Sequence, residues 1–302
     1  MNGYLHPSYA SSLTEFGAPR ELPRSRGWIL ERQIHGHADH DAMGVYPLFA
    51  CQDWSNLHVD LDEIKHDLVC LALITDPFGD YDETYLRLCF KDVVFPFKEH
   101  FIVDLNRPLG TVVSDHHRRN IKKVLDEICV ERCAKPAGHI EEWCRLYTNL
   151  IQRFQITGVS AFSRGAFAKQ LDVPGIVAFR ARHKGVTVGM LLWYIQGNVG
   201  YYHLGAYSEF GYEMRASFAL FSYAIEYFAA HGLRWLNLGA GAGVKGDSAD
   251  GLSRFKRGWS TGTRTVYFCG RIFNQARYTE LAKANRLGST KYFPAYRRGE
   301  FR

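Results

Sequence analysis

Apolar and polar positions change their period twice between Tyr201 and Leu238. The segment from Arg215 to Ala230 contains no glycine or proline, and its apolar residues recur every three or four positions. This spacing predicts a helix with one buried face. Tyr201–Tyr207 and Leu233–Leu238 on either side are short, apolar and partly aromatic, as strands are. The order strand, helix, strand predicts two parallel neighbouring strands joined by a crossover.

The same patterns predict further elements before and after the crossover. Strands are expected at 45–51, 68–75, 95–105, 130–134, 175–181, 186–196 and 266–269, and helices at 83–90, 114–128, 140–154, 163–171 and 278–286, with a helical turn within 54–65. Three antiparallel strands would thus lead into the crossover. The predicted fold class is α/β (α+β), with mixed central sheets flanked by helices.

The chain is expected to divide into four parts. Residues 1–26 are polar and contain three prolines, which favours an irregular N-terminal arm. Residues 27–110 form a first domain, and residues 111–272 a second one, with the boundary at the Pro- and Gly-containing stretch 106–110. Residues 273–302 form a basic tail that could pack back on the first domain.

Composition excludes several classes of protein. Hydrophobic residues make up 46% of the 302 residues, which favours a packed core over disorder. The longest apolar run, Leu68–Ile74, is far shorter than the ~20 residues that span a bilayer. Neither a signal peptide nor a paired cysteine spacing is evident, so the seven cysteines are expected to be reduced thiols in a cytoplasmic protein.

Positive charge is concentrated at the C-terminal end of the chain. Residues 252–302 contain twelve Lys or Arg and two Glu, a net charge of +10, so the remaining residues carry −4 of the total of +6. Such a segment could contact RNA, a phosphate group or an anionic membrane face. The alternative is a solvated surface with internal ion pairs.

The ends of the two crossover strands are the predicted site. The N-terminus of the helix between them presents backbone N–H groups and the positive end of its dipole, which suits an anionic or acyl-activated substrate. Arg215 and Ser217 begin this helix and are candidate donor-binding residues. Gly239, Gly241 and Gly243 follow the second strand, where main-chain N–H groups could approach a substrate. The alternative for this loop, which has neither a Walker pattern nor a dinucleotide fingerprint, is a plain strand exit.

Several motifs together resemble a known family. YYHLGAY at 201–207, ASFALF in the helix, GLRWLNLGAG at 232–241 and GLSRFKRGWS at 251–260 resemble the GNAT-like acyltransferase domain of the Fem (FemAB-type) and BioF2-like group. Ser114 to Ile121 is similar to the opening helix of that domain, so the resemblance covers roughly 114–274. It implies tandem GNAT-like domains, the first a degenerate copy. It also implies transfer of an acyl or aminoacyl group from acyl-CoA or aminoacyl-tRNA to an amine.

The resemblance assigns the leading catalytic role to Lys256, because Fem-type enzymes have a lysine in a similar motif beside the transferred carbonyl. A fixed cation there would stabilise the oxyanion, worth roughly 3–4 kcal/mol for a single donor. His203 could take a proton from the attacking amine, and Tyr207 could donate one to the leaving group. The alternatives are a surface lysine, a core histidine and an aromatic plug.

Tyr202, Phe255 and Arg257 flank these residues and are predicted to contact the substrate or donor. CoA-dependent GNAT members have a glycine-rich turn before the helix. Here the segment from Gly211 to Ser217 keeps one glycine and includes the acidic Glu213, which leaves aminoacyl-tRNA or another donor open.

Two competing hypotheses remain. A GNAT-fold module without activity could bind a glycan or a lipid-linked precursor. His35, His37 and His40, with Asp39 and Asp41, could instead ligate a metal, although their spacing matches no familiar motif and no metal site is predicted.

Overall fold

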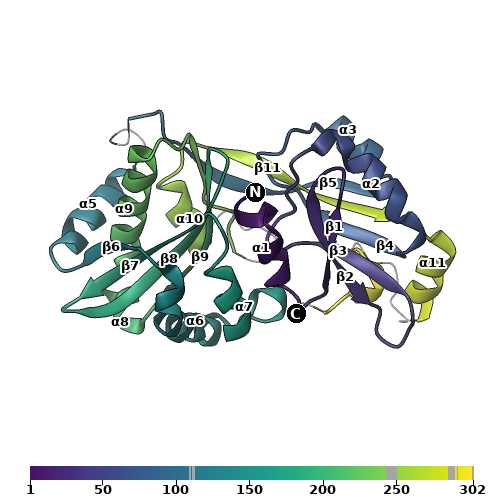
Figure 1. Ribbon diagram of the computed structural model, residues 1–302. Helices are drawn as coiled ribbons and strands as arrows, with labels where there is room; N and C mark the ends of the chain where they lie inside the picture. The colour runs from purple at the N-terminus through teal and green to yellow at the C-terminus, as the bar shows by residue number, and fades with distance from the viewer. Residues whose placement is uncertain (109, 111–112, 243–249, 285–289, 291, 301–302) are drawn as a thin grey trace. The chain divides into compact units, whose positions relative to one another are not determined.

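The computed structural model describes residues 1–108, 110, 113–242, 250–284, 290 and 292–300 (Figure 1). The chain forms two compact units. Unit 1 contains residues 1–3, 98–156 and 163–264, and unit 2 contains residues 4–97, 157–162 and 265–302. Strands β5 (Val93–Asp104) and β11 (Gly262–Ile272) each run from one unit into the other along the sequence.

Unit 1 is a mixed sheet with helices on both faces. Its elements are α5 (Asp115–Leu125), β6 (Cys129–Cys133), α6 (Ile140–Phe154), α7 (Arg164–Gln170), β7 (Ile176–His183), β8 (Val186–Gln196), β9 (Val199–Tyr207), α8 (Glu209–Glu213), α9 (Ala216–Ala230), β10 (Trp235–Asn237) and α10 (Gly251–Arg257). The strand order is β5-β10-β9-β8-β7-β6. β7, β8 and β9 are antiparallel neighbours, and β9 and β10 are parallel, which confirms the predicted crossover.

Successive residues of β8 show how the two faces of this sheet are covered. Trp193 packs against Phe221 and Phe228 of α9, with ring centroids 6.0 and 5.2 Å apart. The hydroxyl of Tyr194, the next residue, donates to the carbonyl of Gln170 at the end of α7, at 2.9 Å. Because consecutive side chains of a strand point to opposite faces, α9 and α7 lie on opposite sides of the sheet.

Unit 2 repeats the combination of a mixed sheet and a crossover. Its elements are α1 (Pro7–Ser11), β1 (Ala18–Leu22), β2 (Gly27–Gln33), β3 (His40–Gly44), α2 (Leu57–Glu63), β4 (Cys70–Ile74), α3 (Glu83–Cys89) and α11 (Gln275–Ala284), with the strand order β1-β2-β3-β4-β11. β3 and β4 are parallel and are connected through α2, as β9 and β10 are through α9. Leu57, Leu61 and Leu71 lie in its buried core.

Two predictions for unit 2 were wrong. Residues 1–26 are not an irregular arm: Pro7 begins the short helix α1, which buries Tyr9, and β1 pairs with β2. The strand expected at 45–51 is β3, which ends at Gly44. Pro47 has no N–H to offer a sheet, and only an isolated bridge between Phe49 and Thr75 follows it.

The C-terminal residues pack within unit 2. Leu281 of α11 and Tyr296 are buried in a cluster with Ile34, Val69 and Cys70. Several of the basic side chains here form ion pairs: Arg271 with Asp62, Arg277 with Asp39 and Arg297 with Asp41. Among the residues that the structure describes, no helix has the length and apolar character needed to cross a membrane.

Candidate functional site

The parallel strands β9 and β10 separate after a short pairing. β10 pairs with β9 over three residues, ending at Asn237 opposite Tyr201, whereas β9 continues to Tyr207. Beyond Asn237 the chain stays with β5, since Leu238 N–H donates to the Phe101 carbonyl at 2.9 Å. Gly239 then turns the chain with φ +72°, a conformation that favours glycine. The strands therefore open into a split at their C-terminal ends.

Lys256 reaches into this split from α10, a helix that the sequence patterns did not predict. Asp250 caps α10 by accepting the N–H of Ser253 at 2.8 Å. The Lys256 Nζ donates to the carbonyl of Ala240 at 2.6 Å and lies 5.4 Å from the centre of the Tyr202 ring on β9. Its ammonium is thus held between the two diverging segments. The side chain is buried, so it is not the surface residue of the alternative hypothesis.

Burial is the main reason why the pKa of Lys256 falls to about 7, and the charge of Lys98 lowers it further. Lys98 comes from β5, and its Nζ lies 3.5 Å from the Gly241 carbonyl, next to the one that Lys256 contacts. Burial also lowers the pKa of Lys98. Two amino groups therefore hold successive carbonyls of the segment after β10.

His100 and Asn237 complete the surroundings of Lys256. The Asn237 side-chain oxygen accepts the N–H of Gly239 at 2.9 Å and lies 3.0 Å from Nδ1 of His100. Nδ1 is therefore assigned as the protonated nitrogen of the ring. Burial, reinforced by the Lys256 charge, lowers the pKa of His100 to about 3. Lys98 and His100 were not among the predicted site residues, although their spacing of two positions on a predicted strand places both side chains on one face.

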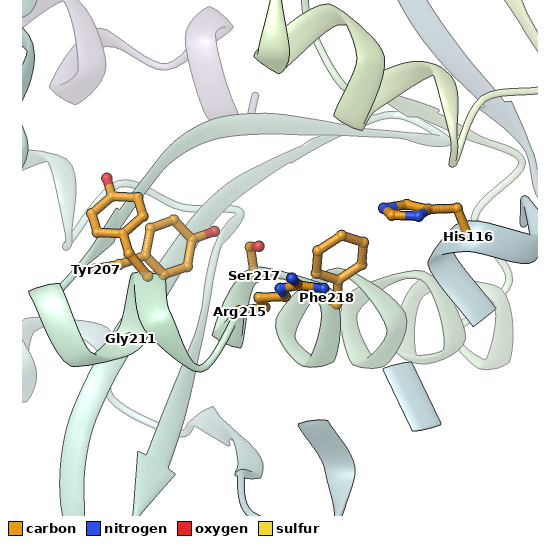
Figure 2. Close-up of a pocket in the computed structure, with 7 residues that line it drawn as sticks. His116, Tyr207, Gly211, Arg215, Ser217 and Phe218 are labelled. Carbon is orange, nitrogen blue, oxygen red and sulfur yellow. The ribbon is translucent and has the colours of Figure 1, made fainter. Parts of the chain in front are cut away.

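A separate cavity lies at the N-terminus of α9. Its volume is about 320 Å³, and it is lined by His116, Tyr207, Gly211, Tyr212, Arg215, Ser217 and Phe218. Figure 2 shows Tyr207 and His116 at opposite ends, with Arg215, Ser217 and Phe218 between them. The structure thus brings together three predicted residues, Tyr207, Arg215 and Ser217. Lys256 does not line this cavity.

Arg215 is held in place by a chain of polar side chains. Its own backbone is left-handed, with φ +57°, just before the first residue of α9. Its guanidinium donates to the side-chain oxygen of Asn120. The amide nitrogen of Asn120 lies 2.8 Å from the His116 carbonyl and 3.1 Å from the His116 ring nitrogen Nε2. This buried amide, which the sequence did not single out, fixes the direction of the arginine.

A bulge in β9 decides where the predicted strand residues point. Leu192 of β8 pairs with Leu204 and Trp193 with Tyr202, so His203 is an extra residue. Strict alternation along the strand would separate Tyr202 from Gly205, and the bulge prevents this. Tyr202 and Gly205 share the α9 face: a Cβ on Gly205 would lie 2.5 Å from the Tyr202 hydroxyl.

His203 lies on the other face of the sheet, away from the cavity. Its Nε2 is 3.2 Å from the side-chain oxygen of Gln170 on α7, and its ring packs against Tyr194. Burial lowers its pKa to about 3, so the ring is neutral. The structure therefore does not bring His203 together with Lys256, and it matches the alternative of a hydrogen-bonded core histidine.

The remaining predicted residues lie around α10. The Phe255 ring packs against Phe218, with centroids 5.2 Å apart, and so connects the cavity wall to the Lys256 helix. Arg257 is exposed, with its guanidinium 5.8 Å from the Phe101 ring. Gly241 lies against the α10 cap, since a Cβ there would be 2.1 Å from the Ser253 hydroxyl. Gly243 lies outside the described residues.

The histidine cluster lies in unit 2, at the connection between β2 and β3. Nδ1 of His37 is 3.0 Å from the guanidinium of Arg277, which also pairs with Asp39 at 2.6 Å. A nearby cation disfavours a metal ion. Within the described residues no three His, Cys, Asp or Glu side chains are grouped to hold one.

Comparison with known proteins identifies the class of fold around this site. Residues 114–257 match the family model described as an acetyltransferase (GNAT) domain, so the chain carries a GNAT-type acetyltransferase domain. The α9 cavity, the split and Lys256 all lie within these residues. No curated protein matches the chain.

Three solved structures are similar over nearly the whole chain. FemX is 15% identical over 92% of this chain and 94% of its own, with a TM-score of 0.68. L-PGS from Bacillus licheniformis is 15% identical, covering 95% and 98%, with a TM-score of 0.58. A conserved protein of unknown function from Bacteroides thetaiotaomicron VPI-5482 is 13% identical, covering 90% and 91%, with a TM-score of 0.59. The fold is therefore a mixed α/β fold of the kind found in FemX.

Proposed function

We propose that this protein transfers an acyl or aminoacyl group from an activated donor, an acyl-CoA thioester or an aminoacyl-tRNA ester, to an amine. The observation that carries the proposal is the position of Lys256. Its amino group is buried between β9 and the segment after β10, 2.6 Å from the Ala240 carbonyl, within a GNAT-type domain. A donor carbonyl that entered the split would meet this group.

The proposed reaction has a simple balance. The amine nitrogen attacks the donor carbonyl, a C–N bond forms, and the C–S or C–O bond to the leaving group breaks. The carbonyl oxygen carries negative charge in between, and an N–H of Lys256 stabilises it. Since its pKa is about 7, the lysine is partly cationic at neutral pH, and a developing oxyanion favours the charged form.

Tyr207 is the candidate for proton transfer. It lines the cavity, at the end opposite His116 (Figure 2). With an aminoacyl-tRNA donor, whose leaving oxygen is on the ribose of the terminal adenosine, the Tyr207 hydroxyl gives its proton to that oxygen and receives the proton lost by the attacking amine. Burial raises the pKa of Tyr207, which keeps the hydroxyl protonated before reaction.

The α9 cavity is proposed to hold phosphate groups of the donor. Arg215 has five N–H donors, and Asn120 accepts from one of them within the described residues. The Ser217 hydroxyl and the N-terminus of α9 add neutral donors. Phe218 and Phe255 connect this subsite to Lys256, so one extended donor could occupy both places.

Transfer to a small amine would test the proposal. Hydroxylamine can replace the unknown acceptor, with a panel of acyl-CoA thioesters and bulk tRNA charged with labelled amino acids as donors. Wild-type protein should accelerate acyl hydroxamate formation from at least one donor. Lys256→Met should lower that rate about 10²- to 10³-fold, as expected for loss of one oxyanion donor.

Lys122→Met is the matched control, because Lys122 is exposed on α5 of the same unit. It should retain the wild-type rate. An unchanged rate in Lys256→Met would remove the assignment of the site. Donor binding without any transfer would favour the non-catalytic binding module instead.

A further inference from the structure

The rim of the α9 cavity carries a cluster of rings and a guanidinium that the proposed chemistry does not use. Arg153 and Phe154 end helix α6, and Tyr212 belongs to α8 and lines the cavity. The Arg153 guanidinium lies 4.4 Å from the centre of the Tyr212 ring and 5.9 Å from that of Phe154. The guanidinium also forms an ion pair with the Glu209 carboxylate, with Nη1 2.7 Å from Oε2. The two ring centroids are 6.5 Å apart, so the guanidinium and the two rings form a compact triangle.

One large aromatic side chain of this cluster is exposed to solvent. Phe154 is 59% exposed, and its ring centroid lies 6.5 Å from that of Tyr212. An exposed ring beside a fixed guanidinium is the arrangement on which proteins stack nucleic-acid bases. The aromatic ring and the guanidinium each offer a flat face, and stacking on either does not require the base to have a particular hydrogen-bond pattern.

The cavity beside this rim independently points to a polar ligand. Tyr207 is only 8% exposed, and it lines the cavity. A bound molecule in the cavity would therefore contact this side chain. Arg215 and Ser217 lie in the same cavity, as Figure 2 shows. A phosphate-bearing ligand fits these groups.

We propose that Arg153, Phe154 and Tyr212 form a platform for the adenine base of the donor, whose adjoining phosphate lies at Arg215. This inference rests on the proposed function and names the donor part that it recognises. Adenosine 5′-phosphate is common to coenzyme A and to the 3′ end of tRNA. The platform could therefore recognise either donor. It would do so without the glycine-rich turn that CoA-dependent GNAT members have before the helix equivalent to α9.

Binding measurements with ligand pairs that differ in the base test the platform. Calorimetry would compare ADP with inorganic pyrophosphate, and coenzyme A with 4′-phosphopantetheine. An RNA minihelix ending in CCA would be compared with the same RNA ending in CC, which distinguishes the tRNA source from coenzyme A. Wild-type protein should prefer the adenine-bearing member of at least one pair.

Phe154→Ala should reduce that preference about 5- to 150-fold, the range for one stacked base, and leave pyrophosphate binding unchanged. Phe95→Ala is the control, because Phe95 is exposed to a comparable 42% in the other unit. Arg215→Ala should weaken both members of each pair. Equal binding of both members by wild type, an unchanged preference in Phe154→Ala, or no binding of any ligand would each overturn the platform. A protein that binds adenine but transfers nothing would refute the proposed reaction alone.

Discussion

Replacing Lys256 by methionine should change how the free energy of unfolding depends on pH. A lysine with a pKa of 10.5 in the unfolded chain has a pKa of about 7 in the fold, chiefly because the amino group is buried. Between these values the unfolded state binds more protons than the folded state. The stability of the wild type must therefore rise with pH in this window, by up to about 1.4 kcal/mol per pH unit from this one group.

The magnitude follows from the two pKa values. Between pH 7.5 and 9.5 the free energy of unfolding of the wild type should rise by about 2.5 kcal/mol relative to that of Lys256→Met, because methionine does not titrate. Urea unfolding of both proteins at three pH values would measure the difference. A constant offset from the changed packing does not matter, because only the dependence on pH is compared. The other titrating groups are shared by the two proteins.

Lys122→Met should show the same pH dependence as the wild type, since the Lys122 side chain is exposed. If the difference between wild type and Lys256→Met were the same at all three pH values, Lys256 would not be desolvated. Its position between β9 and the Ala240 carbonyl would then be wrong, and Lys256 would be fully charged at neutral pH.

Three further changes test the cavity. Asn120→Asp places a carboxylate against Arg215 and should weaken pyrophosphate binding about tenfold by calorimetry, because the arginine is then neutralised. Gly211→Ala puts a Cβ 2.0 Å from a backbone carbonyl and should cost about 1–3 kcal/mol in urea unfolding, whereas Gly138→Ala, with open space, should cost little. Tyr207→Phe should slow acyl transfer about 10²-fold or more and change stability by less than about 0.5 kcal/mol.

Much of the GNAT domain could be predicted from periodicity. Helix α6 and strand β8 have the predicted bounds, and the crossover around α9 is parallel as expected. These elements bury long, regular apolar faces, so the local pattern and the packing agree. The five-residue helices α1 and α8 were missed, because five residues contain too few turns to show a period. Helix α10 was also missed, although it is as long as α3 and α7, which were predicted.

The site was only partly predictable because its parts come from distant segments. Arg215, Ser217 and Lys256 were found from their own local motifs. Asn120, Lys98 and His100 owe their roles to contacts across 95 to 158 residues of sequence: Asn120 contacts Arg215, and Lys98 and His100 act on Lys256. The local sequence around a polar residue on a helix or strand does not predict such a long-range contact. Only the packing of β5 beside β10 and of α5 beside α9 creates it.

The extra residue in β9 connects the two halves of the site. Tyr202 and Tyr207 are five positions apart, so an unbroken strand would place them on opposite faces. With His203 bulged out, Tyr202 pairs opposite Trp193 and Tyr207 opposite Gly189, which share a face of β8. One strand then supplies both the ring beneath the Lys256 amino group and the hydroxyl in the α9 cavity. The failure of alternation at His203 therefore puts Tyr202 and Tyr207, two residues of the proposed site, on the face of the sheet that α9 covers.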